Sequence, residues 1–171
     1  MRSQKTQLQI QFDNLVKDYK ERLYWHIRRM VVSHDDADDV LQNTFIKVYK
    51  NLDKFKGDSQ LFTWLYRIAT NESLTFLKKK ARRLQVNDEQ LQSQLTANLK
   101  SDPYFDGDAA QEKLQNAINT LPQRQKQVFL LKYYDELPYT EIANILEISV
   151  GSLKASYHHA VKKITLYVTE D

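Results

Sequence analysis

The chain has 171 residues, of which 42% are hydrophobic, and it contains only three glycines and three prolines. This length allows one medium domain or two small ones, and the shortage of turn-forming residues favours long helices over a sheet. Because there is no cysteine, disulfides and thiolate metal sites are excluded. No stretch reaches the roughly 20 apolar residues of a membrane span, and the first residues lack a signal peptide's apolar run. We therefore expect a cytoplasmic protein with no membrane insertion.

The net charge of +3 is unevenly distributed along the chain. Residues 1–80 carry 15 Lys/Arg against 10 Asp/Glu, residues 81–111 carry 3 against 5, and residues 112–171 carry 7 of each. Within the last segment, residues 149–165 include three lysines and no acid. Two local basic surfaces on a nearly neutral chain favour an anionic partner that is contacted at two places. Ordinary solvated helix faces would produce the same pattern, so charge alone leaves both interpretations open.

Three amphipathic helices are expected in the first 80 residues. Apolar residues recur at helical spacing from residue 12 to residue 31. Asp35 or Asp36 is placed to cap a second helix, and a turn signal at residues 55–59 separates it from a third helix at about residues 60–80. Three such helices form one small bundle.

The helical pattern weakens between the two halves of the chain. Residues 83–110 are expected to form a flexible linker, which could include a short helix at about residues 88–99. The predicted organisation is therefore all-α, with a helical domain at residues 1–82, this linker, and a second helical domain at residues 111–171 whose end is a helix-turn-helix.

The helix-turn-helix is the sharpest local signal. Thr140 is placed to cap its first helix, and Ser149 is a good N-cap for its second. On the second helix an apolar stripe runs from Leu153 to Ile164 at helical spacing. The opposite face is small, polar and basic, and it includes Ser152, Lys154, Ala155, Ser156, His158, His159 and Lys162. Such a face suits the major groove of DNA, although a plain helical hairpin with a solvated basic face would share the pattern.

Three blocks of the chain resemble the extracytoplasmic-function group of bacterial sigma factors. Residues 121–164 resemble the fourth conserved domain of that family. Residues 36–45 (DADDVLQNTF) resemble its polymerase-docking segment, and residues 55–71 (FKGDSQLFTWLYRIATN) resemble its promoter-melting and minus-ten segment. The resemblance spans nearly the whole chain outside the linker.

The resemblance implies a sigma factor that binds core RNA polymerase, through the beta-prime clamp and the beta flap, and promoter DNA. It also implies an anti-sigma partner, no catalytic residue, no metal and no cofactor. The implied polymerase contacts are Asp38, Asp39, Gln42 and Asn43. The implied minus-ten contacts are Lys56, Asp58, Ser59, Gln60, Arg67, Asn71, Lys78 and Lys79. The implied minus-thirty-five contacts are Ser149, Ser152, Lys154, Ala155, Ser156, His158 and Lys162.

Some residues depart from the family pattern. Glu147 stands where the family commonly has Gly, which predicts a residue in a strained backbone state at the turn. Ser156, His159 and Val161 stand where family members often have Arg, which predicts a weaker electrostatic grip on DNA. Trp64 is flanked by apolar residues, and we expect it in the core rather than stacked on a base.

Two other classes of protein share some of these features. A recombinase or nuclease can carry a helix-turn-helix, but the acidic run at residues 35–39 points in several directions on a helix, and the four histidines lack ligand spacing. A response regulator or repressor would bind duplex DNA alone, usually as a dimer. Such a protein has no need of the block at residues 55–71.

Overall fold

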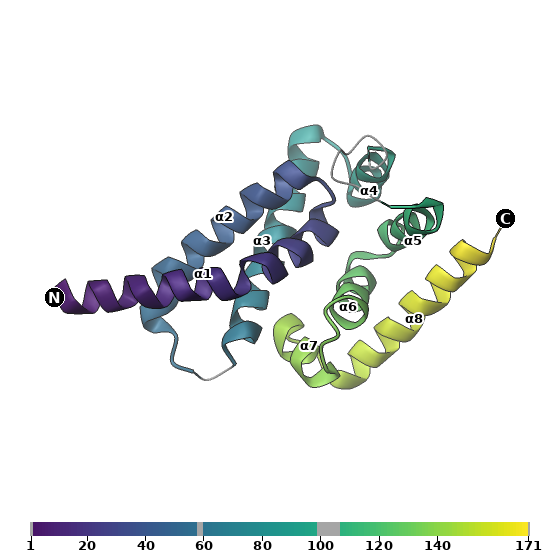
Figure 1. Ribbon diagram of the computed structural model, residues 1–171. Helices are drawn as coiled ribbons and strands as arrows, with labels where there is room; N and C mark the ends of the chain where they lie inside the picture. Colours follow the sequence, from purple (N-terminus) through teal and green to yellow (C-terminus); the bar gives the residue numbers. More distant parts are fainter. Residues whose placement is uncertain (1, 58–59, 99–106, 171) are drawn as a thin grey trace.

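The structure is a computed structural model that describes residues 2–57, 60–98 and 107–170. Every regular element in these ranges is helical, which confirms the predicted all-α class (Figure 1). The elements are α1 (Arg2–Val31), α2 (His34–Asn51), the 3₁₀ turn η1 (Leu52–Lys54), α3 (Leu61–Leu84), α4 (Asp88–Ala97), α5 (Ala109–Asn119), α6 (Gln123–Tyr133), α7 (Tyr139–Leu146) and α8 (Val150–Thr169).

Helices α1, α2 and α3 form the N-terminal bundle. Its core includes Leu23 and Ile27 from α1, Val40 from α2, and Leu65 and Tyr66 from α3, all of them buried. The helix α1 is 30 residues long, and its first half extends past the rest of the bundle (Figure 1).

A very tight corner joins α1 to α2. The Ser33 amide donates to the Val31 carbonyl at 2.9 Å, and the buried Val32 between them has a φ of 73°. This is a γ-turn with positive φ, a rare conformation for a β-branched residue. Ser33 is also the N-cap of α2, because its side chain accepts from the Asp36 amide at 3.4 Å. The prediction of Asp35 or Asp36 as the cap was therefore wrong; both lie in the first turn, where the helix dipole favours carboxylates.

Helices α5 to α8 form the C-terminal bundle. Ile118, Leu130, Leu131, Ile142 and Leu153 are fully buried and represent all four helices. The helix α8 lies at the outer edge of the bundle, on the side away from the N-terminal bundle (Figure 1).

The helix-turn-helix consists of α7 and α8. Ser149 caps α8 as predicted, since its hydroxyl accepts from the Ser152 amide at 3.1 Å. Thr140 does not cap α7, because that helix already begins at Tyr139, directly after Pro138. Pro138 takes the cap position, and its carbonyl accepts from the Glu141 and Ile142 amides at 3.0 and 3.1 Å.

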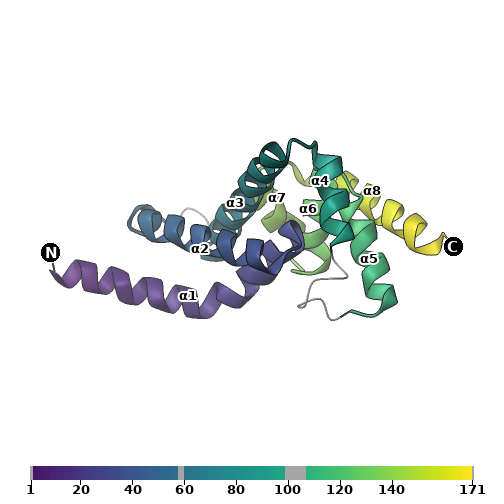
Figure 2. The same ribbon diagram turned by 90° about the horizontal axis from the view of Figure 1, so that it is seen from above.

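The helix α4 lies between the two bundles. Asn87 and Gln90 form a reciprocal capping box at its start, and Leu91 and Leu95 are buried. Figure 2 shows α4 between the end of α3 and α5. The short helix expected within the linker is thus present as α4, and it packs against its neighbours through these buried leucines. The bundles also touch directly, α1 against α6 and α3 against α7.

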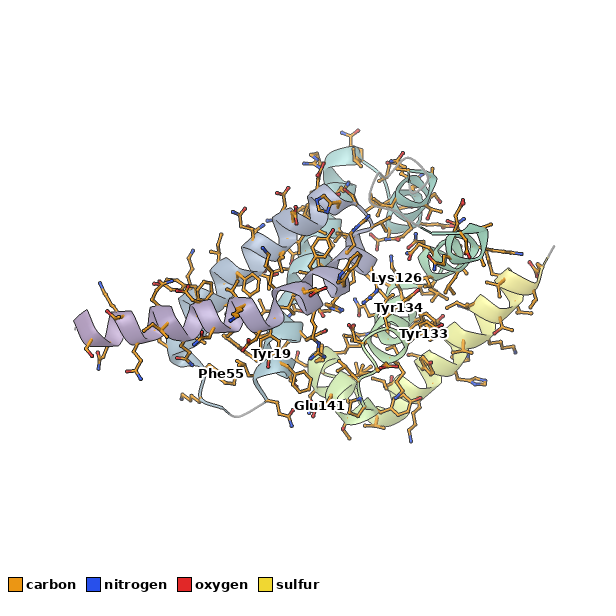
Figure 3. The ribbon with its side chains drawn as sticks, in the orientation of Figure 1. Tyr19, Phe55, Lys126, Tyr133, Tyr134 and Glu141 are labelled. Atoms are coloured by element: carbon orange, nitrogen blue, oxygen red, sulfur yellow. The ribbon has the colours of Figure 1, made fainter. Side chains whose placement is uncertain are left out.

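Lys126 of α6 is buried where α1, α4 and the C-terminal bundle meet (Figure 3). Its ammonium donates to the Asn119 side chain at 3.1 Å, to the Gln92 side chain at 3.1 Å and to the Met30 carbonyl at 3.4 Å. All three acceptors are neutral. Burial lowers the pKa of Lys126 to about 7.

The buried Lys126 should make the stability of the protein depend on pH, and Lys126→Met should remove this dependence. The pKa of Lys126 is near 7 in the folded chain and near 10.4 in the unfolded chain. At pH values between these two pKa values, the unfolded chain therefore binds one more proton than the folded chain. We expect the free energy of unfolding to rise from pH 7.5 to pH 9.5, by at most about 1.4 kcal/mol per pH unit. Denaturant titrations should show this rise in the wild type and not in Lys126→Met.

The control for this measurement is Lys163→Met, which removes an exposed lysine from α8 and should keep the rise. Parallel pH profiles for the wild type and Lys126→Met would contradict the lowered pKa. Tyrosines with raised pKa values, such as Tyr134, affect stability only above about pH 10, outside the measured window.

Candidate functional site

The first candidate surface is the groove between α1 and α2, which we call the α1–α2 groove. It has a volume of about 780 Å³. Its apolar part is aromatic: the Phe12 ring packs edge-on against Tyr49 at 5.0 Å between centroids. Ile46 and Tyr49 remain 46% and 42% exposed. An apolar strip of this kind on a water-facing helix is typical of a docking surface.

The predicted polymerase contacts lie at this groove with one exception. Asp38, Asp39 and Gln42 are exposed and line it, beside Phe45. Asn43 is exposed but is not part of the lining. Lys20 and Lys50 line the same groove, so its aromatic floor is bordered by side chains of both charges and by an amide.

The second candidate surface is a hollow of about 410 Å³ beside the turn before α3, which we call the turn hollow. The Phe55 and Trp64 rings form its aromatic wall, with centroids 4.9 Å apart and planes inclined at 30°. Trp64 is half-buried and packs against the core, in line with the prediction, and Phe55 covers one face of the indole. Another part of the ring borders the hollow. The remaining lining residues are Lys47, Asn51, Lys54, Lys56, Arg67 and Ile68.

The structure gathers some of the predicted minus-ten residues and separates others. Lys56 and Arg67 line the turn hollow, and Asn71 is exposed one helical turn after Arg67. Gln60 is exposed at the N-cap of α3. Asp58 and Ser59 lie outside the described residues. The exposed Lys78 and Lys79 are about 17 to 18 Å along α3 from Arg67, at 1.5 Å per residue.

Sequence reasoning missed three members of the turn hollow. Lys47 and Asn51 belong to α2 and Lys54 to η1. Their spacing along the chain does not indicate that these residues lie beside α3. The positive φ of Gly57, at 75°, is a local signal for the reversal that brings η1 back against α3.

The third candidate surface is the outward face of α8, which we call the recognition face. Ser152, Lys154, Ala155, His158 and Lys162 are exposed on it, and Ser156 is half-buried. The exposed Ser149 lies at the N-terminus of the helix, where amide groups favour an anion. Lys154 Nζ lies 5.6 Å from the centroid of the Tyr139 ring. As predicted, Glu147 at the turn has a left-handed backbone, with a φ of 56°.

One buried arrangement has the order of an acid–base–nucleophile triad. His26 Nε2 lies 2.9 Å from the Thr70 hydroxyl, and His26 Nδ1 lies 3.3 Å from Asp135 Oδ2. Thr70 is 2% exposed and His26 is 1% exposed. Because a substrate cannot reach the hydroxyl, this chain of contacts acts as a bridge between α1, α3 and the segment after α6.

The part of the chain that the structure describes contains no group of three or more metal-ligating side chains. Likewise, none of its helices is long and apolar enough to cross a membrane.

Comparison with known proteins gives consistent results. Residues 15–83 match the model of sigma-70 region 2, and residues 111–164 match that of sigma-70 region 4. The chain is 33% identical to the ECF RNA polymerase sigma factor SigW of Bacillus subtilis, over 86% of this chain and 83% of that one. It is 32% identical to the ECF RNA polymerase sigma-E factor of Escherichia coli K12, over 90% and 84%.

A solved structure supports the fold. The sigma factor RpoE of Bartonella quintana, solved in complex with the anti-sigma factor NepR, superposes with a TM-score of 0.73 at 20% identity. The match covers 94% of this chain and 98% of that one. Together with the matched regions and relatives, this identifies the chain as a member of the extracytoplasmic-function sigma factors of the sigma-70 family, the subunits that bind core RNA polymerase and direct promoter-specific transcription initiation.

Proposed function

We propose that this sigma factor uses the three surfaces separately: the α1–α2 groove for core polymerase, the turn hollow and α3 for the minus-ten element, and the recognition face for the minus-thirty-five element. The observation that carries the proposal is their different chemistry. The groove is aromatic with a rim that carries both charges, whereas the hollow combines lysines with two aromatic rings and the recognition face is basic and free of acids.

The α1–α2 groove suits a helix of the beta-prime clamp. Exposed Ile46 and Tyr49 would be buried by such a helix, while Asp39 and Gln42 would pair with its basic or amide side chains. The polymerase contacts assigned here are Asp38, Asp39, Gln42 and Asn43. On the C-terminal bundle, exposed Tyr133 is an apolar candidate for contact with the beta flap.

The turn hollow suits a base taken out of the DNA stack. Its aromatic wall offers a face for stacking, and its lysines would neutralise the neighbouring phosphates. Arg67 borders the hollow, and its guanidinium would donate to a base or phosphate. The minus-ten contacts assigned here are Lys56, Asp58, Ser59, Gln60, Arg67, Asn71, Lys78 and Lys79.

The recognition face suits the major groove of duplex DNA. Lys154 lies near the N-terminus of α8, where side chains of a recognition helix meet base edges. The helix start and Ser149 would bind a phosphate. The minus-thirty-five contacts assigned here are Ser149, Ser152, Lys154, Ala155, Ser156, His158 and Lys162.

The functional division proposed is residues 1–82 for polymerase docking and the minus-ten element, 83–110 as connection, and 111–171 for the minus-thirty-five element. The protein would act in the cytoplasm, where its polymerase lies, and would leave all catalysis to that enzyme. An anti-sigma partner is also proposed. Two structural relatives support it, because both were solved as complexes with anti-sigma proteins or domains: RpoE with NepR, and CnrH with the cytosolic domain of CnrY, at a TM-score of 0.67.

Reconstitution with core polymerase tests the proposal as a whole. We expect the chain to form a stable complex with core enzyme, and promoter DNA selected from a genomic library to be retained by that complex. Binding to the selected DNA that is equally strong without core enzyme, together with no complex, would instead favour a duplex-binding repressor or response regulator.

A double substitution tests the clamp contact. Asp39→Ala with Gln42→Ala removes two rim side chains of the α1–α2 groove and should weaken core binding about tenfold or more, equivalent to ~1.4 kcal/mol. Fluorescence anisotropy with labelled protein would measure the affinity, and circular dichroism should show unchanged helicity. The matched control is Asp53→Ala with Gln94→Ala, at exposed positions outside the groove. Equal core affinity in all three proteins would refute the assignment.

Lys154→Ala tests base reading by α8. Loss of a direct base contact should cost roughly 1–3 kcal/mol at one promoter position and relax the preference there. Holoenzyme binding to a set of single-base minus-thirty-five variants would measure this. Lys163→Ala, at another exposed lysine of the same helix, should act evenly or not at all. If Lys154→Ala also acts evenly across all sequences, Lys154 contacts phosphate rather than a base.

A further inference from the structure

A further cavity of the molecule lies apart from the three surfaces described above, although it shares Lys78 with the minus-ten assignment. It has a volume of about 700 Å³, which is within the range of pockets that bind small molecules. The helix α4 forms one wall, and the others come from the ends of α1, α5 and α8, the C-terminal half of α3 and the start of α6. We call it the α4 cavity.

The walls of the α4 cavity are mainly apolar. Met30, Leu77, Leu91 and Leu121 line it, and all four are buried. They come from four segments of the chain: α1, α3, α4 and the turn after α5. Aliphatic side chains that converge from several directions offer close contacts to a hydrocarbon chain, so the walls suit a ligand with an apolar part.

Two buried polar side chains line the same cavity. Lys126, labelled in Figure 3, is 5% exposed, and the groups that accept from its ammonium, on Asn119, Gln92 and Met30, are all neutral. Asn119 is 3% exposed, and its Nδ2 has no hydrogen-bond partner among the described residues. A buried charge without a counter-charge and a buried donor without an acceptor both cost free energy. The cavity therefore has polar groups that an anionic ligand would satisfy.

A carboxylate answers both requirements. One of its oxygens would accept from the Lys126 ammonium and the other from Asn119 Nδ2. Gln92 is a half-buried residue of the cavity wall, so its side chain can rotate away and leave its place beside the ammonium to the ligand. A carboxylate there would also stabilise the charged form of Lys126, whose pKa is lowered to about 7 by burial.

Other classes of ligand fit the α4 cavity less well. The Lys126 ammonium would repel a cation, and a neutral hydrocarbon would leave both polar groups unmatched. An inorganic anion would make no use of the apolar walls. The charged side chains of Lys78, Asp88 and Glu89 also border the cavity, but they are exposed, so water and salt screen their effect on a bound anion.

We propose that the α4 cavity binds a small amphipathic monocarboxylate, with its carboxylate on Lys126 and Asn119 and its hydrocarbon chain along the buried apolar walls. The proposal does not depend on the functions assigned to the three surfaces, so its test needs neither polymerase nor DNA. Because the carboxylate pairs with a charged Lys126, binding at alkaline pH requires the chain to take up a proton.

Isothermal titration calorimetry of the full chain with sodium octanoate tests the proposal. We expect saturable binding of one octanoate per chain. Acetate lacks the hydrocarbon chain and 1-octanol lacks the charge, so each should bind at least about tenfold more weakly. At pH 8.5, titrations in buffers of different ionisation enthalpy should show uptake of about one proton per octanoate bound.

The decisive variant is Lys126→Met, which should lower octanoate affinity about tenfold or more and abolish the proton uptake. The control is Lys163→Met, which removes an exposed lysine of α8 and should change neither quantity. Both variants keep the other titratable residues of the lining, so a loss of proton uptake in Lys126→Met alone is due to Lys126. These residues are Lys78, Asp88, Glu89 and Tyr167.

A second variant tests the location without changing Lys126. Ala97 is exposed and borders the cavity, so Ala97→Trp would fill part of it and should lower octanoate affinity about tenfold. Ala110→Trp introduces the same ring at an exposed position of α5 outside the lining and should bind octanoate as the wild type does. Circular dichroism should show the same helicity in all variants.

Three results would overturn the proposal. Absence of octanoate binding to the wild type would remove the site altogether. Equal octanoate affinity in the wild type and Lys126→Met, or equal affinity of the wild type for octanoate and 1-octanol, would remove the pairing with Lys126. Unchanged octanoate affinity in Ala97→Trp would show that octanoate binds outside the α4 cavity.

Discussion

The arrangement of the whole molecule depends on where the Asp135 carboxylate is placed. An ionised side chain that leaves water requires partners that offset its lost hydration, and here Arg29, His26 and Tyr66 supply them from the other bundle. Burial, and after it the same carboxylate, raises the pKa of the Tyr66 hydroxyl above its ordinary range, so the hydroxyl remains a donor.

The sequence predicted the local features well and the long-range ones poorly. Helix positions, the Ser149 cap and the strained Glu147 all follow from residues within a few positions of each other. The Asp135 cluster joins residues 69 or more positions apart, and Lys126 reaches Met30 across 96. Nothing local marks either residue as buried, since charged side chains are almost always on the surface. Trp64 packs against the core, as its apolar neighbours indicate, but those neighbours do not reveal that one part of its ring also borders a basic hollow.

The two DNA surfaces differ in how they are built. The recognition face is carried by one helix, so its residues can be read from helical spacing alone. The turn hollow draws side chains from α2, η1 and α3, and its shape depends on the reversal at Gly57. A surface on one helix keeps its shape when the rest of the bundle moves. A surface built from three elements keeps its shape only while those elements hold their relative positions.

The corner between α1 and α2 has a consequence for the groove that they enclose. A γ-turn at Val32 joins the two helices through one residue with positive φ, and the Ser33 cap fixes the next. Because the connection between the two helices is so short, it cannot adjust to a change in the angle between them. We therefore expect α1 and α2 to move as one rigid unit. A partner that binds in the α1–α2 groove therefore meets a preformed surface, and little binding free energy is lost to reorganisation of the protein.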